Sequence, residues 1–248
     1  MVKNRVIKRI LRCAVAVLVT LCILCGACLL FLMDSNAADW EAIDAFSAAN
    51  AITPQEAGGY LVFAPEDATV GFIFYPGARV EYEAYIPLME ACAAEGVLCV
   101  LVDMPMNFPL ICGDAAEGLP EMYTQIERWY IGGHSLGGYA ASDYLAEHTD
   151  EYEGLVLLAS YSSADLSETK LKALTVYGSE DRIMNRERYA EGITKLPVGY
   201  TETVIEGGCH AYFGMYVGQD GDVTLPVTNE EQIYVTARAI VDFIGLSE

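Results

Sequence analysis

The alternation of apolar runs with helical stretches from Tyr60 onward is the feature that most constrains the fold. Residues 60–64 (YLVFA) and 69–75 (TVGFIFY) are rich in β-branched and aromatic side chains and are separated by the turn signal PEDA. Residues 81–96 place apolar side chains at helical spacing and end at a glycine, and residues 97–105 (VLCVLVDMP) form a continuous apolar strand pattern. Because strands of this kind are buried on both faces, the pattern predicts an α/β fold with a mostly parallel central sheet and helices on both faces.

The same alternation continues to the C-terminal end of the chain. Further strands are expected at 128–133, 154–160, 171–178 and 201–207, and further helices at 118–127, 137–148, 187–196 and 229–245. We find no internal repeat in this pattern, so residues 59–248 are predicted to form a single domain.

The first 33 residues have a different composition. Five basic residues and no acidic residue precede position 13, and Cys13–Met33 carries no charge. At a helical rise of about 1.5 Å per residue, this run spans roughly 30 Å, the thickness of a bilayer's hydrocarbon core. We therefore expect a cytoplasmic basic segment at 1–12 and a single-pass signal anchor in the cell membrane at 13–33. The domain would then lie outside the cytoplasm, after a juxtamembrane helix or linker at 34–58.

Two alternatives to an uncleaved anchor remain open. The small residues of SNAAD (35–39) are compatible with cleavage of a signal peptide, and Cys28 is a weaker candidate for lipid modification. An extracytoplasmic domain also permits disulfides, and Cys112 with Cys209 is the candidate pair.

Acidic residues dominate the chain after the apolar run. Residues 34–248 hold all 35 Asp and Glu but only nine of the 14 Lys and Arg, because five of these precede residue 13; the net charge of this part is −26. Such a charge disfavours nucleic acid and anionic lipid surfaces as partners and mildly favours small neutral or cationic substrates, although solubility explains the acidity equally well. This part has no CxxC pair, and GQDGD (218–222) lacks the full calcium-loop pattern, so no metal site is predicted.

The glycine-rich stretch at residues 133–137 (GHSLG) lies between a predicted strand and a predicted helix. A dinucleotide fingerprint fails because His134 or Ser135 occupies its second glycine, and a phosphate loop fails because Gly138 and Tyr139 replace its Lys and Ser or Thr. The pattern that fits is G-x-S-x-G, a strained turn that holds a serine hydroxyl exposed above a sheet. Ser135 is therefore the candidate nucleophile.

A serine hydroxyl needs a base to take its proton, and the chain has three histidines. His134 lies inside the turn itself and is expected to point away from the partner of the serine. His148 is expected to cap the end of a helix. His210 directly follows a predicted strand, at the same sheet edge as Ser135, and is the predicted base.

The acid that orients the base is expected between the serine and the histidine in the chain. Asp181 follows a predicted buried strand and a turn glycine, and Glu180 is its nearest rival. An oxyanion hole also needs two main-chain N–H donors. These are predicted at Leu136, directly after the nucleophile, and at Ala78, in the loop after an earlier strand.

Taken together, these motifs resemble the α/β-hydrolase superfamily and, within it, small lidless bacterial serine hydrolases related to the dienelactone-hydrolase group. The resemblance extends over residues 59–248, and its motifs are YPGARVEYEAYIPLMEACAAEGVLCVLVDMP (75–105), IGGHSLGG (131–138), VYGSEDRI (176–183) and EGGCHAYFG (206–214). It implies an α/β-hydrolase catalytic domain without a cofactor, in which Ser135, Asp181 and His210 are the nucleophile, acid and base and Ala78 and Leu136 are the oxyanion donors.

The resemblance also implies that Asn107, Tyr212 and Phe213 line the mouth of the substrate pocket, and packing that holds the His210 loop remains an alternative for Tyr212 and Phe213. The chain departs from the pattern in two places. Pro76-Gly77 stands where many relatives have His-Gly, and a serine stands where dienelactone hydrolases proper have a cysteine, so their substrate does not carry over.

We therefore expect a membrane-anchored extracytoplasmic serine hydrolase, a carboxylesterase that works through an acyl-enzyme. Few residues separate the strand that ends near Ser160 from the one that starts near Leu171, which leaves no room for a sizeable lid. Acyl transfer to another acceptor, amide or peptide cleavage by the same triad, and a non-catalytic binding module remain alternatives. The oligomeric state is left open.

Overall fold

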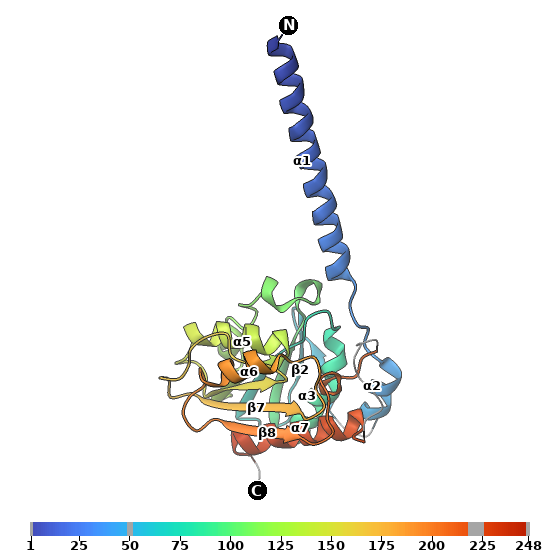
Figure 1. Ribbon diagram of the computed structural model, residues 1–248. Helices are drawn as coiled ribbons and strands as arrows, with labels where there is room; N and C mark the ends of the chain where they lie inside the picture. The colour runs from blue at the N-terminus through green and yellow to red at the C-terminus, as the bar shows by residue number, and fades with distance from the viewer. Residues whose placement is uncertain (1, 49–51, 218–225, 247–248) are drawn as a thin grey trace. The chain divides into compact units, whose positions relative to one another are not determined.

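The computed structural model describes residues 2–48, 52–217 and 226–246 (Figure 1). The chain divides into two units, Met1–Ser35 and Asn36–Glu248. The first unit is the helix α1 (Val2–Met33), in which Lys8–Ala27 is long and apolar enough to cross a membrane. A signal sequence near an N-terminus has the same length and composition, so the helix fits an anchor and a signal sequence alike.

The second unit is built on one sheet, whose strands in the described residues have the order β1-β2-β4-β3-β5-β6-β7-β8. The edge strand β1 (Gln55–Glu56) pairs antiparallel with β2 (Tyr60–Phe63), β2 pairs antiparallel with β4, and the remaining neighbours pair parallel. The parallel strands are β3 (Val70–Tyr75), β4 (Val97–Val102), β5 (Arg128–His134), β6 (Gly154–Leu158), β7 (Lys172–Gly178) and β8 (Thr201–Ile205). This sheet confirms the predicted mostly parallel α/β architecture.

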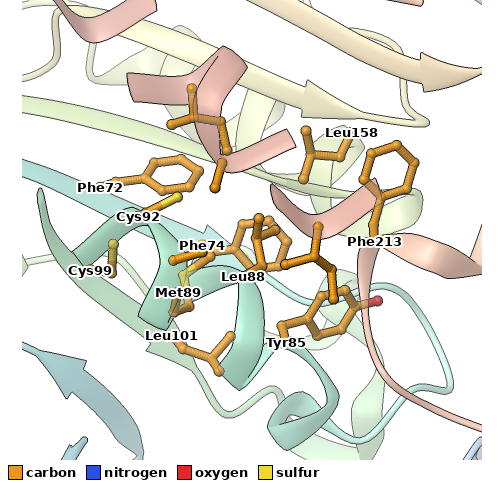
Figure 2. Close-up of a cluster of buried hydrophobic side chains, with 14 of the residues drawn as sticks. Phe72, Phe74, Tyr85, Leu88, Met89, Cys92, Cys99, Leu101, Leu158 and Phe213 are labelled. Atoms are coloured by element: carbon orange, nitrogen blue, oxygen red, sulfur yellow. The ribbon is translucent and has the colours of Figure 1, made fainter. Parts of the chain in front are cut away.

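Helices cover both faces of the sheet, as predicted. One core packs against α2 (Trp40–Ser47), α3 (Ile86–Ala94) and α7 (Asn229–Ile244). The other packs against α4 (Leu119–Met122), α5 (Leu136–Glu147) and α6 (Arg186–Ile193). Alternate residues of β3 divide between these cores: Phe72 and Phe74 face α3, where Figure 2 shows them with Leu88 and Met89, and Ile73 and Tyr75 face the other side.

The C-terminal helix shows how local sequence sets element boundaries. Thr228 and Glu231 form a reciprocal capping box that fixes the start of α7, and Gly245, with φ 77°, ends it in the left-handed region that glycine adopts without strain. Short 3-10 helices lie at η1 (Tyr82–Tyr85), η2 (Pro105–Asn107), η3 (Pro109–Ile111) and η4 (Ala211–Phe213).

Residues 36–58, expected to form a juxtamembrane helix or linker, contain α2 and β1 and belong to the compact second unit. Ile43 and Phe46 of α2 are buried in the core beside α3. The main-chain N–H of Asn36 donates to the carbonyl of Arg79 at 2.6 Å. The mostly polar, alanine-rich composition concealed this packing because only two large apolar side chains of α2 carry it.

One minor expectation is resolved here, and a second is not tested. The thiol of Cys112 donates to Oδ1 of Asp114 at 3.5 Å, so it forms no disulfide with Cys209. The GQDGD stretch at 218–222 lies outside the described residues.

Candidate active site

The predicted triad residues each follow the carboxyl end of a parallel strand. Ser135 follows β5, Asp181 follows β7 and His210 follows β8. Parallel strands bring their carboxyl ends to one edge of a sheet, so the fold collects residues that lie up to 75 positions apart, from 135 to 210, at that edge.

Ser135 occupies a strained turn between β5 and α5. Its φ of 51° and ψ of −121° lie where a side chain is disfavoured, and such strain persists only where the surroundings enforce it. A Cβ at Gly133 or Gly137 would lie 2.4 and 2.2 Å from main-chain oxygen of Tyr75, so only glycine allows the turn to approach β3 this closely. The hydroxyl of Ser160 donates to the carbonyl of Ser135 at 2.6 Å and holds the turn in place.

Asp181 and His210 form a buried hydrogen-bonded pair. Nδ1 of His210 lies 2.8 Å from Oδ2 of Asp181, and the other carboxylate oxygen accepts the N–H groups of Ile183 and Met184, each at 2.8 Å. Burial alone would raise the pKa of Asp181, but the hydrogen bond and charge interaction with His210, together with the two amide bonds, lower it below its usual range. The carboxylate is therefore ionised and fixed in orientation, and it holds the Nδ1 proton of His210.

The rival acid, Glu180, lies elsewhere. Its side chain is 45% exposed and forms an ion pair with Arg182 at 3.7 Å. Its main-chain N–H donates to Gly208, so it supports the loop before His210 without facing the imidazole.

The His210 loop is held by a residue that the sequence analysis did not identify. Gln232 of α7 is fully buried; its Oε1 accepts the N–H of Cys209 at 2.9 Å, and its Nε2 donates to the Cys209 carbonyl at 2.8 Å. A polar side chain on the apolar stripe of an otherwise amphipathic helix was the signal that could have identified it.

The main-chain N–H groups of the two predicted oxyanion donors are free of acceptors within the described residues. Leu136 is the first residue of α5, where main-chain N–H groups have no acceptor within the helix. In the loop after β3, the N–H of Gly77 donates to the hydroxyl of Tyr85, and the N–H of Arg79 donates to the carbonyl of Asn107. Within the described residues the N–H of Ala78 has no acceptor, which leaves it available to a substrate oxygen.

A cavity of about 160 Å³ opens beside Ser135 and His210. Its walls are Leu136, Tyr139, Ala159, Ser160, Tyr161, Ile183, Met184 and Asn185. A larger groove of about 840 Å³ lies at the opposite, amino ends of β7 and β8 and contains none of the triad.

The predicted pocket residues Asn107, Tyr212 and Phe213 are absent from these walls. Phe213 is fully buried and packs on the ring of His134, with the centroids 5.4 Å apart. Asn107 supports the loop after β3 through its carbonyl. The walls come instead from α5 and from the turns after β6 and β7, whose spatial proximity the linear pattern did not reveal.

His134 is also placed differently from the expectation. Its ring packs against His210, with the centroids 4.6 Å apart, and so does not point away from the base. This orientation of the His134 ring follows from the pleat of β5, which directs His134 to the face of the sheet where the His210 loop packs. His148 does cap the end of α5, and its Nδ1 lies 2.9 Å from Glu151.

Among the described residues no group of three or more His, Cys, Asp or Glu side chains is arranged to hold a metal ion. The structure thus brings a strained serine and a buried Asp181–His210 pair together beside one cavity at this edge of the sheet.

Comparisons with known proteins identify the family and the fold. A profile described as "Alpha/beta hydrolase family" matches residues 71–234. The chain belongs to the alpha/beta hydrolase family.

Solved structures of the same fold include a predicted CIB-like hydrolase from Thermoplasma acidophilum, at 15% identity and a TM-score of 0.55, covering 78% of this chain and 99% of that one. A dienelactone hydrolase from Anabaena variabilis aligns at 14% identity and a TM-score of 0.56, covering 78% and 97%. No curated protein matches the chain in sequence. At these identities the structural likeness establishes the fold, and membership of the family supports hydrolase activity.

Proposed function

We propose that this α/β hydrolase is a serine carboxylesterase whose triad is Ser135, Asp181 and His210. The observation that carries the proposal is the strained serine beside a buried, oriented Asp181–His210 pair at one sheet edge. A loop histidine or an ordinary glycine turn would require neither the backbone strain nor the buried ionised carboxylate.

The chemistry follows from the positions of these groups. Oγ of Ser135 attacks the substrate carbonyl while Nε2 of His210 takes its proton, and the Asp181 carboxylate stabilises the resulting imidazolium. The N–H groups of Ala78 and Leu136 donate to the oxygen that becomes negative. His210 then protonates the leaving alcohol, and a water activated in the same way releases the acid.

The cavity supports a small, uncharged acyl group as the substrate. About 160 Å³ is below the usual size of a drug-like pocket, and its walls carry tyrosine, leucine, isoleucine and methionine. The segment between β6 and β7 spans only residues 159–171, which is too short to hold a sizeable lid at that position.

Hydrolysis of p-nitrophenyl esters tests the proposal. The full chain in a maltoside detergent is expected to cleave the acetate faster than the dodecanoate, and Ser135→Ala is expected to abolish both activities. An unchanged rate in Ser135→Ala would refute the proposed nucleophile. The alternative, acyl transfer by the same triad, predicts that an added alcohol or amine becomes the main acyl acceptor over water; amide cleavage predicts turnover of the matching anilide.

We further propose that α1 anchors the chain in the cell membrane, with its N-terminus in the cytoplasm and the hydrolase domain outside. The five basic residues before the apolar run support this orientation. Protease added to intact cells is expected to degrade the hydrolase domain, and protection until the cells are lysed would refute the orientation. A mature protein lacking residues 1–33 would instead support the cleaved signal.

A further inference from the structure

Two buried polar side chains behind the triad have no part in the mechanism described above. Tyr85, at the end of η1, is fully buried, and His134, at the end of β5, is 1% exposed. Figure 2 shows Tyr85 on the α3 side of the sheet, among Phe74 and Leu88. A hydroxyl and an imidazole in such surroundings are costly unless both are hydrogen-bonded.

The hydroxyl of Tyr85 connects two loops of the site. It accepts the N–H of Gly77 at 3.1 Å and lies 2.8 Å from Nδ1 of His134. Because the Gly77 N–H can only donate, the single hydroxyl proton is available to Nδ1 of His134. Gly77 precedes the proposed donor Ala78 and His134 precedes Ser135, so one oxygen atom fixes the spacing between the oxyanion loop and the nucleophile turn.

The loop backbone at Gly77 lies close against this oxygen. A Cβ at Gly77 would lie 2.8 Å from Nδ1 of His134 and 2.9 Å from the Tyr85 hydroxyl. The loop thus approaches the hydroxyl and the imidazole so closely that only glycine fits.

The imidazole of His134 in turn supports the catalytic base. Its ring lies against His210 on one side and Phe213 on another, with centroid distances of 4.6 and 5.4 Å. Burial, and next the charge that His210 carries when protonated, lower the pKa of His134 well below its usual range. His134 therefore stays neutral, and His210 can become an imidazolium without a like charge beside it.

We propose that Tyr85 and His134 are positioning residues that hold the oxyanion loop, the nucleophile turn and the ring of His210 in register. His134 acts through the ring of His210 that it contacts, and Tyr85 acts through Gly77 and His134. The inference rests on the proposed serine hydrolase mechanism. A displacement of about 1 Å between reacting groups is enough to lower a rate as much as 100-fold, so loss of this one oxygen is expected to act on turnover.

The test measures turnover per active site for Tyr85→Phe, which removes only the hydroxyl. Active sites in the full chain are counted by the end point of fluorophosphonate labelling, and kcat and KM are measured with p-nitrophenyl acetate. We expect kcat per labelled site to fall about tenfold, with KM changed less than about twofold. The oxyanion loop and the nucleophile turn would shift relative to each other, which weakens interactions that form in the transition state. His134→Phe keeps a neutral packed ring but removes the acceptor; we expect it to lower kcat about fivefold alone and less than about twofold in the Tyr85→Phe background.

Tyr130→Phe is the matched control. Tyr130 also lies fully buried in β5, but its hydroxyl has no hydrogen-bond partner among the described residues, so kcat per site is expected to stay unchanged. The inference is overturned if Tyr85→Phe lowers only the number of labelled sites while its kcat per site stays at the wild-type value. It is also overturned if the kcat decreases of Tyr85→Phe and His134→Phe multiply in the double variant. Should Tyr85→Phe not fold, an unchanged kcat in His134→Phe overturns it equally. If the wild-type chain itself neither labels nor hydrolyses the ester, the failure is that of the proposed function.

Discussion

Replacing Asp181 by Asn tests how the acid orients the base. In the native site Oδ1 accepts two N–H groups and Oδ2 faces Nδ1 of His210. An Asn side chain keeps both amide bonds only if its carbonyl oxygen takes the Oδ1 position. Its NH2 group then faces Nδ1 of His210, which must act as an acceptor, and the ring proton moves to Nε2, where it faces Ser135.

The magnitude follows from the cost of the other orientation. Turning the amide around would leave its NH2 group facing the N–H donors of Ile183 and Met184, at about 1–3 kcal/mol for each unsatisfied group. The Asn side chain therefore favours the tautomer of His210 that carries its proton on Nε2. Loss of the correct tautomer in a Ser-His-Asp triad lowers kcat about 10⁴-fold, equivalent to about 5 kcal/mol of transition-state stabilisation.

The assay is p-nitrophenyl acetate hydrolysis by Asp181→Asn, with Glu180→Gln as the matched control. Both substitutions remove one negative charge from adjacent positions, but Glu180 is exposed and does not face His210. We expect Glu180→Gln to stay within about twofold of the wild-type rate. A loss below about tenfold in Asp181→Asn, or an equal loss in both variants, would refute the assignment of Asp181 as the acid.

Two further predictions concern the turn and the core. Ser160→Ala removes the bond to the Ser135 carbonyl and is expected to lower kcat about tenfold and stability by about 1 kcal/mol. Ser162→Ala, which removes a bond to Ala164 in the same segment, should lower stability and leave kcat unchanged; equal kcat in the two variants would contradict the reasoning. Burial raises the pKa of Glu90, so the folded state binds a proton at this carboxyl more readily than the unfolded state does. Glu90 therefore destabilises the fold increasingly as the pH rises from the pKa of the unfolded state to the higher pKa of the folded state. Glu90→Gln is thus expected to raise the urea midpoint more at pH 7 than at pH 4. A larger increase at pH 4 would contradict a raised pKa of Glu90 in the folded state.

The strand pattern made the fold predictable, and it indicated where the proposed triad residues should lie. Continuous apolar runs such as 97–102 cannot face water on either side, which demands a sheet covered by helices. Once the strands are parallel, residues that directly follow them share one edge. For this reason Ser135, Asp181 and His210 could be proposed as a triad from the sequence, and the structure places Nδ1 of His210 2.8 Å from Oδ2 of Asp181.

The supporting residues were not predictable in this way, because they depend on which elements pack together. The position of His134 against His210 requires the pleat of β5 and the order of β7 and β8 in the sheet. The contact between Tyr85 and Gly77 bridges a loop and a 3-10 helix, for which no sequence period exists. Gln232 lies 22 residues after His210 and reaches its loop only because α7 packs back across the sheet.

The most direct test of the central claim is fluorophosphonate labelling of the wild-type chain and of Ser135→Ala, followed by mass spectrometry of the peptides. The reagent phosphonylates a serine only where a base activates its hydroxyl and donors stabilise the developing oxyanion. We predict one adduct, on Ser135, in the wild-type chain and none in the variant. Equal labelling of both proteins, or labelling of neither, would contradict the assignment of Ser135 as an activated nucleophile.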